Sequence, residues 1–93
     1  MTYNVAFTKS ALKALKKLDP SVAKIIISWI KKNLVGTDNP KAHGKQLKGT
    51  LSNFWRYRVG DYRILCEIKD DQLLIIIVVV GHRREIYDRA DND

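Results

Sequence analysis

The sequence has a single cysteine, Cys66, and no N-terminal segment with the character of a signal peptide. One cysteine excludes an internal disulfide and is typical of proteins that work in a reducing compartment. The stretch from Lys9 to Lys17 is basic and amphipathic, whereas a signal peptide has an apolar centre. The longest apolar run, Leu73 to Val80, has eight residues, far too few to span a bilayer. These absences predict a cytoplasmic protein with no membrane partner.

The sequence also lacks the patterns that mark the commonest catalytic sites. It has no Cys/His cluster, no motif of paired carboxylates and no glycine-rich phosphate loop. The sequence therefore offers no candidate residues for metal-assisted hydrolysis or for a catalytic triad. We expect neither a metal nor a cofactor. Linkers, internal repeats and low-complexity segments are absent as well. The 93 residues suit one domain with a modest core, spanning 1–93, with a loosely held tail after about residue 88.

Positive charge is concentrated in the first two thirds of the chain. Residues 1–60 carry ten Lys and two Arg against two Asp, a net of +10, whereas residues 61–93 carry five basic and eight acidic residues, a net of −3. A basic surface of this kind is typical of proteins that bind nucleic acid, although any single Lys is more often part of a solvated face. Lysines attract phosphate as point charges, and arginines offer a planar two-point contact.

The patterning predicts a small α+β domain with the order β-α-α-β-β-β. Alternating apolar residues from Tyr3 to Phe7 indicate a half-buried strand. Thr8 can cap a first amphipathic helix, and Asp19-Pro20 can start a second one that ends near Leu34. We expect an N-terminal strand and a two-helix hairpin packed on one face of a four-stranded, largely antiparallel sheet.

Two arginines distinguish the predicted hairpin that follows. The segments on either side of Gly60-Asp61 read as strands joined by a two-residue turn. That turn places Arg58 opposite Arg63, with Arg56 on the same face two residues away. Like charges directly opposite each other destabilise a hairpin. Three guanidiniums on one surface therefore indicate that a polyanion binds there, and nucleic acid is the leading candidate.

The last strand, Leu73 to Val80, is apolar throughout, which is typical of a strand buried on both faces. If the Asp70-Asp71 turn pairs Lys69 with Gln72, alternate side chains of this strand share the face of the arginines. These side chains are Leu74, Ile76, Val78 and Val80. Because the two helices cover the other face, either a partner chain or the C-terminal tail covers this one.

The segment Gly81-His-Arg-Arg-Glu-Ile-Tyr87 completes a resemblance that runs through nearly the whole chain. With the helix start at Phe7-Thr-Lys-Ser-Ala-Leu-Lys, the Leu47-Lys-Gly49 step and Tyr62-Arg63-Ile64-Leu65, the chain is similar to the RelE-like toxins of the RelE/ParE superfamily. The resemblance implies a toxin of a type II toxin–antitoxin system. It implies a ribosome-dependent endoribonuclease that cuts mRNA in the A site by attack of the ribose 2′-OH, without a metal. It also implies a RelB-like antitoxin, acidic or amphipathic, in a toxin–antitoxin hetero-oligomer.

The same resemblance implies roles for individual residues. Catalytic roles fall on Arg56, Arg58, Arg63, Arg83 and Tyr87. We expect RNA contacts from Lys41, Lys45, Lys48, His82 and Arg84. Antitoxin contacts are expected from Leu74, Ile76, Val78, Arg58, Arg63 and Arg83. Arg56 and Arg58 stand where the best-known members have lysines, and an arginine effectively cannot lose its proton. Proton transfer would then fall to Tyr87, or to His82, although a lone histidine in a turn is more often structural.

Two other functions are compatible with the sequence. A ParE-like toxin would poison DNA gyrase by binding, but such relatives usually lack the full set of basic residues and the tyrosine. A non-catalytic nucleic-acid-binding member of the superfamily is the third possibility, and the arginines at the usual lysine positions allow it.

Overall fold

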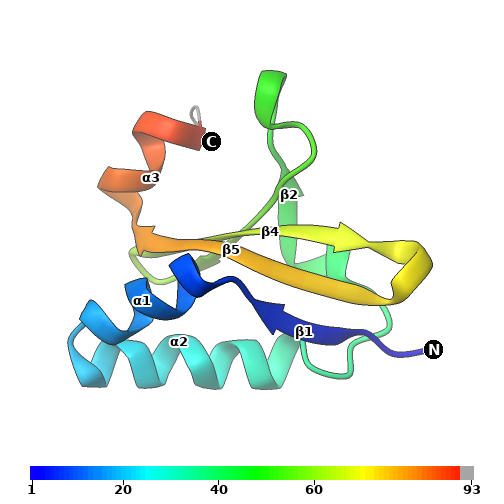
Figure 1. The fold of residues 1–93 in the computed structure, drawn as a ribbon, viewed down its shortest axis with the longest axis horizontal. Helices are drawn as coiled ribbons and strands as arrows, with labels where there is room; N and C mark the ends of the chain where they lie inside the picture. Colours follow the sequence, from blue (N-terminus) through cyan, green and yellow to red (C-terminus); the bar gives the residue numbers. More distant parts are fainter. Residues whose placement is uncertain (91–93) are drawn as a thin grey trace.

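The computed structural model describes residues 1–90, with side chains described as far as Ile86. Its elements, shown in Figure 1, are β1 (Asn4–Phe7), α1 (Lys9–Lys17), α2 (Pro20–Asn33), β2 (Gly44–Gln46), β3 (Trp55–Val59), β4 (Tyr62–Lys69), β5 (Leu74–His82) and α3 (Arg83–Ala90). The strands form one sheet in the order β1-β5-β4-β3-β2. β1 runs parallel to β5, and the other neighbouring strands are antiparallel. The α+β class is as predicted, with a mixed five-stranded sheet in place of four strands.

Both predicted helix starts are confirmed. The Thr8 side chain accepts a hydrogen bond from the Ala11 amide at 3.1 Å, which satisfies one of the amides that a helix leaves unpaired at its start. Asp19 caps α2 in the same way, accepting from the Ser21 amide at 3.1 Å, and Pro20 occupies the first turn. Local sequence chemistry therefore sets where the two-helix hairpin begins and where it turns.

The main core lies between this hairpin and the sheet. Ala11 and Leu15 of α1 and Ile26 and Ile30 of α2 are buried in one cluster with strand residues. The strand residues of this cluster are Tyr57, Val59, Ile64, Cys66, Ile75, Ile77 and Val80. Figure 1 shows α1 and α2 on one side of the sheet and α3 on the other. None of the described helices is long and apolar enough to cross a membrane.

Side chains alternate along β3 and β4, so the residues between these core positions point to the opposite face of the sheet. We call this surface, which carries Arg56, Arg58 and Arg63, the arginine face. It is covered in part by a second, smaller core formed by Leu47, Leu65 and Ile86. Of the two predicted alternatives, a partner chain or the C-terminal segment, the second is borne out in part, because α3 and the loop before β3 both pack on this face.

The register of β5 corrects the predicted face of Val80. The short helical turn Asp70–Gln72, with Leu73 at φ 50°, pairs Lys69 with Leu74. Leu74 and Ile76 keep the predicted face. Between Leu65 and Cys66 the register shifts: Leu65 pairs with Val79 and Cys66 with Ile77, which leaves Val78 as an extra residue. Beyond this bulge the alternation is inverted, and Val80 belongs to the helix-side core.

Two elements were not predicted. β2 is a three-residue strand within the segment expected to be a polar loop, and α3 begins directly after β5. The tail predicted to be loosely held, after about residue 88, begins within the last turn of α3, and its final residues, 91–93, lie outside the described part of the chain.

Candidate nucleic-acid interface

Arg58 and Arg63 lie directly opposite each other in the β3–β4 hairpin, as predicted. The turn Gly60-Asp61 sets this register, and Gly60 has φ 58°, a left-handed conformation that glycine adopts without strain. On its other side, Arg63 is opposite Gly81 of β5. One row across three strands therefore brings two guanidiniums to the arginine face.

The three arginines of this face differ in their exposure to solvent. Arg56 is 4% exposed and Arg63 is 5% exposed, whereas Arg58 is exposed to solvent. A buried charge is costly unless it is hydrogen-bonded, and each of the three side chains has an interaction partner. The convergence of three guanidiniums is confirmed, but only Arg58 among them presents an exposed side chain to a large ligand.

The guanidinium of Arg63 is held by the hairpin turn. Its Nη1 donates to the backbone carbonyls of Gly60 at 2.9 Å and Tyr62 at 3.0 Å. Charge-assisted hydrogen bonds of this kind are among the stronger ones in proteins. Arg63 therefore stabilises the turn that carries Asp61. It also places a positive charge on the strand next to Arg58.

β2 brings a lysine to the same face. Lys45 is paired with Arg56 across the β2–β3 ladder, and its side chain is exposed. A shallow pocket of about 240 Å³ is lined here by Lys45, Arg56, Arg58 and His43. His43 was not predicted as a site residue, and no pattern in the loop sequence indicates it. The predicted RNA-contact residue Lys45 thus lies beside two predicted catalytic arginines.

Arg83 lies at the junction of β5 and α3, beside the hairpin turn. Its amide donates to the carbonyl of Asp61 at 2.8 Å, and its Nε lies 4.0 Å from Asp61 Oδ1. The Arg83 side chain remains 48% exposed. The turn therefore joins Arg58 and Arg83 at one corner of the sheet, although they are far apart in sequence.

His82 lies on the other face. It is paired with Tyr62, and the two rings make an edge-to-face contact with centroids 5.3 Å apart. The His82 Nδ1 accepts a hydrogen bond from the Arg84 amide at 3.2 Å. A ring that accepts at Nδ1 has its proton on Nε2, so its one ring lone pair is already engaged by the backbone amide. This geometry disfavours His82 as a general base.

The remaining predicted RNA contacts are more widely spread. Lys41 forms an ion pair with Asp70 at 3.3 Å and lies 6.0 Å from the centre of the Trp55 ring, away from the arginine pair. Lys48 is exposed before the short helical turn Gly49–Leu51, and Arg84 is exposed on α3. The backbone of Tyr87 lies on α3, but its side chain is outside the described part of the chain.

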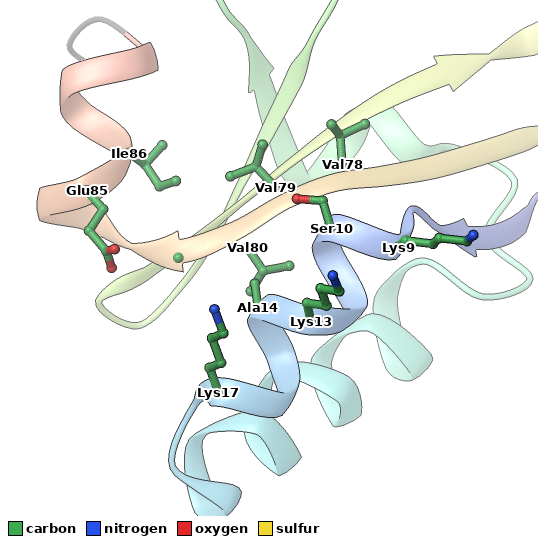
Figure 2. A pocket seen from close by; sticks show the side chains of 11 residues that line it. Lys9, Ser10, Lys13, Ala14, Lys17, Val78, Val79, Val80, Glu85 and Ile86 are labelled. Carbon is green, nitrogen blue, oxygen red and sulfur yellow. The ribbon is translucent and has the colours of Figure 1, made fainter.

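A groove separates α1 from α3 along the edge of β5 (Figure 2). Its volume is about 550 Å³, and its base is formed by Val78 to Gly81. Three lysines of α1, Lys9, Lys13 and Lys17, line one side, and Glu85 and Ile86 of α3 line the other. β1 pairs with β5 only as far as Ile77, so this part of the β5 edge is flanked by helices. Of the predicted antitoxin contacts, Val78 lies in this groove, whereas Leu74 and Ile76 lie further along β5.

The one cysteine is unsuited to nucleophilic chemistry. Cys66 is fully buried in the main core, and burial raises the pKa of its thiol to about 12. Within the described part of the chain, no group of three or more His, Cys, Asp or Glu residues is arranged to hold a metal ion. The arginine face, by contrast, offers cations that can stabilise negative charge.

Comparison with known proteins gives one family. Residues 5–87 match the family described as the ParE toxin of the type II toxin–antitoxin system parDE. Toxin RelG of Mycobacterium tuberculosis is 34% identical over 89 residues, covering 96% of this chain and 100% of that protein. Toxin RelE3 of Methanocaldococcus jannaschii is 35% identical over 86 residues, covering 90% of this chain and 94% of that protein.

Solved structures agree. A chain of the toxin–antitoxin complex RelBE2 from Mycobacterium tuberculosis has a TM-score of 0.81 and 31% identity, covering 89% of this chain and 100% of that chain. A mutant of the Escherichia coli toxin RelE in the free state has a TM-score of 0.73 at 22% identity, covering 97% and 95%. At 22% identity, the similarity to Escherichia coli RelE is evidence for a shared fold only.

Proposed function

Because this chain belongs to the ParE toxin family of type II toxin–antitoxin systems, as a RelE-like toxin of the RelE/ParE superfamily, we propose that it cleaves messenger RNA in the ribosomal A site. The curated relatives that it matches over nearly their full length are named as RelE and RelG toxins. The proposed reaction is a metal-independent endonucleolytic cut that stops translation.

The observation that carries this proposal is the corner formed by the hairpin turn and the start of α3. Arg58 is exposed two residues before the turn, and Arg83 is hydrogen-bonded to Asp61 within it. Lys45 lies on the same face, opposite Arg56. Exposed cations on neighbouring segments can hold a phosphodiester from more than one side, which a scattered basic surface cannot do.

In the proposed reaction, the ribose 2′-oxygen attacks the adjacent phosphorus and the 5′-oxygen leaves. Negative charge builds up on the phosphorane oxygens in the transition state, and preorganised guanidiniums stabilise it. We assign this role to Arg58 and Arg83, which are exposed. Arg56 and Arg63 are buried, so we assign them to the support of the site, through the strand pair and the turn.

Proton transfer needs another group, because an arginine remains protonated at any pH that the protein tolerates. His82 uses its Nδ1 lone pair to accept from the backbone. We therefore propose Tyr87 of α3 as the proton carrier. Substitution of Tyr87 by Phe should then lower the cleavage rate while leaving ribosome binding in place.

We further propose that an acidic or amphipathic antitoxin of the RelB type neutralises the toxin. The groove in Figure 2 supports this, because it combines an apolar base with three lysines and an unpaired stretch of strand edge. A bound antitoxin segment there would also contact Glu85 and Ile86 of α3, the helix that begins with Arg83. Charge reversal at Lys13 and Arg83 should weaken antitoxin binding, whereas charge reversal at Lys32, which is exposed on α2, should not.

A second candidate function follows from the matched family itself, whose description names the parDE system. A ParE-like toxin would inhibit DNA gyrase by binding. The exposed Arg58 and Arg83 favour RNA cleavage, since inhibition by binding does not require a phosphate site. A supercoiling assay with purified gyrase separates the two.

The test uses purified ribosomes with an mRNA that places a defined codon in the A site. We expect cleavage within that codon by the intact protein, and a loss of about 100-fold or more for Arg83→Ala, as when one charge-stabilising group is removed from an active site. The matched control is Lys32→Ala on the opposite side of the molecule, which should cleave normally. Absence of cleavage by folded protein, together with inhibition of supercoiling, would establish the gyrase alternative.

A further inference from the structure

The proposed cleavage moves two protons. The 2′-hydroxyl must lose its proton as its oxygen attacks the phosphorus, and the leaving 5′-oxygen must gain one. A tyrosine ordinarily keeps its proton near neutral pH, because its usual pKa is about 10, so the Tyr87 proposed above starts as a proton donor. A separate group is then needed to accept the proton of the 2′-hydroxyl.

His43 lies beside Arg58, directly before β2. The register of the β2–β3 ladder pairs Gly44 with Tyr57, so the position before Gly44, which is His43, comes opposite Arg58. Arg58 in turn faces Arg63 on β4. A line across the sheet therefore runs from His43 through both arginines.

His43 and Arg58 also line one pocket. This pocket, of about 240 Å³, is lined in addition by Lys45 and Arg56. Among the described residues that line it, none is acidic. Cations without acidic neighbours attract the phosphodiester backbone of RNA. The imidazole therefore lies where that backbone would bind.

The short helical turn that carries His43, Pro40–His43, is attached to the core. The buried Tyr57 hydroxyl donates to the carbonyl of Pro40 at 2.7 Å. The His43 ring meets the Trp29 ring edge to face, with centroids 6.2 Å apart and an interplanar angle of 82°. These contacts place the imidazole before a substrate binds, which favours proton transfer at a defined atom.

The nitrogens of His43 are available to a substrate. The residue is exposed, and within the described part of the chain no hydrogen bond or ion pair engages its ring. A neutral imidazole has one ring nitrogen that can accept a proton, and histidine is the side chain that does so near neutral pH. His82 differs, because its Nδ1 already accepts from the Arg84 amide.

Other titratable side chains of the β3–β4 hairpin are less suited to this role. Tyr57 is buried, and burial raises the pKa of its hydroxyl well above the usual range. Burial likewise raises the pKa of the Cys66 thiol to about 12. Carboxylates as a class are weak bases near neutral pH, and that of Asp61 lies 4.0 Å from the Nε of Arg83. His43 is the better proton acceptor.

We infer that His43 accepts the proton of the 2′-hydroxyl in the proposed RNA cleavage, on which this inference rests. As the 2′-oxygen bonds to phosphorus, its proton passes to the imidazole. As the bond from phosphorus to the 5′-oxygen breaks, that oxygen takes a proton from Tyr87. The products are a 2′,3′-cyclic phosphate and a 5′-hydroxyl. Water then takes the proton from His43 and returns one to Tyr87, which restores both side chains.

The test measures the single-turnover cleavage rate on purified ribosomes that carry an mRNA with a defined A-site codon. We expect His43→Ala and His43→Gln to lower the maximal rate by about 100-fold or more, the loss typical of a missing general base. The protein concentration that gives half of that rate should change little. Added imidazole should restore part of the rate of His43→Ala, but none of the rate of Arg83→Ala. Lys32→Ala is the control and should cleave normally, and urea denaturation shows that each variant is folded.

A second substrate distinguishes a proton acceptor from a proton donor. It has sulfur in place of the 5′-oxygen at the scissile phosphate, and a thiolate leaves without taking a proton. Tyr87→Phe should cleave this substrate as fast as the intact protein does. His43→Ala should remain slow on it, because the 2′-hydroxyl must still lose its proton.

Three results would overturn the inference. One is a normal rate for folded His43→Gln, and another is a loss that appears only as weaker binding. The third is full recovery of His43→Ala on the sulfur substrate, which would make His43 the proton donor. The proposed function has a separate outcome: cleavage by the intact protein that is lost in Arg83→Ala supports it even if His43→Gln cleaves normally. Absence of cleavage by the intact, folded protein would overturn both.

Discussion

Arg63 donates from Nη1 to the carbonyl of Gly60 at 2.9 Å, so its buried guanidinium stabilises the hairpin turn. This turn directly links the strand of Arg63 to the strand of Arg58, the residue opposite it. The two arginines that face each other therefore differ in their surroundings. One holds the backbone in place, and the other is exposed to a ligand.

The first prediction concerns this difference. Arg63→Ala removes hydrogen bonds from two carbonyls and leaves a cavity, and should lower the free energy of unfolding by about 3 kcal/mol. Arg58→Ala removes an exposed side chain and should change it by less than about 1 kcal/mol. Urea denaturation measures both. Equal destabilisation by the two substitutions would show that Arg63 has no special part in the turn.

The second prediction concerns Gly44, where β2 passes closest to β3. A Cβ at this position would meet the Arg56 carbonyl oxygen and would lie 2.8 Å from Trp55 Nε1. Gly44→Ala should therefore destabilise the fold by about 2 kcal/mol and separate Lys45 from Arg56, which lowers RNA cleavage. Gly36→Ala is the control: it adds left-handed strain of about 1 kcal/mol in open space and should leave cleavage intact. Normal cleavage by a folded Gly44→Ala protein would exclude β2 from the site.

The third prediction concerns pH. Hydrogen bonds from Tyr3 and Lys41 lower the pKa of Asp70, because they stabilise its carboxylate. This stabilisation is complete above the pKa of Asp in the unfolded chain, about 3.9, and is lost as the pH falls through the lower pKa of the folded protein. The stability difference between the natural protein and Asp70→Asn should therefore shrink in acid. A stability difference that stays the same from neutral to acid pH would contradict this role of the Asp70 carboxylate.

The fourth prediction concerns Cys66. Since burial raises the pKa of its thiol to about 12, an aromatic disulfide reagent should not react with the native protein near neutral pH. Reaction should occur only as fast as the protein opens, and should become rapid in denaturant. Prompt reaction of native protein would mean that the core between the helices and the sheet opens readily.

Sequence reasoning succeeded where the controlling interactions are local. Thr8 and Asp19-Pro20 identify the helix starts because capping involves neighbours in sequence. Gly60-Asp61 identifies the Arg58–Arg63 pair because a two-residue turn sets the register of a hairpin.

It failed where packing between distant segments decides the outcome. The bulge beside Leu65 is hidden in a strand of uniformly apolar residues, where a shift by one position changes no visible pattern. Burial of Arg56 and Arg63 depends on β2, the loop before β3 and α3. β2 is too short to show alternation, and α3 carries few apolar residues, so neither has a strong periodic signal.

The most direct test of the central claim is the end chemistry of the RNA fragments made on ribosomes with a defined A-site codon. Attack by the 2′-oxygen keeps the phosphate on the upstream fragment as a 2′,3′-cyclic phosphate and leaves a 5′-hydroxyl on the downstream fragment. We predict these ends with the intact protein and with Lys32→Ala, and none with Arg83→Ala. A 5′-phosphate on the downstream fragment, or the same cleavage by Arg83→Ala, would contradict catalysis by 2′-hydroxyl attack at the arginine corner.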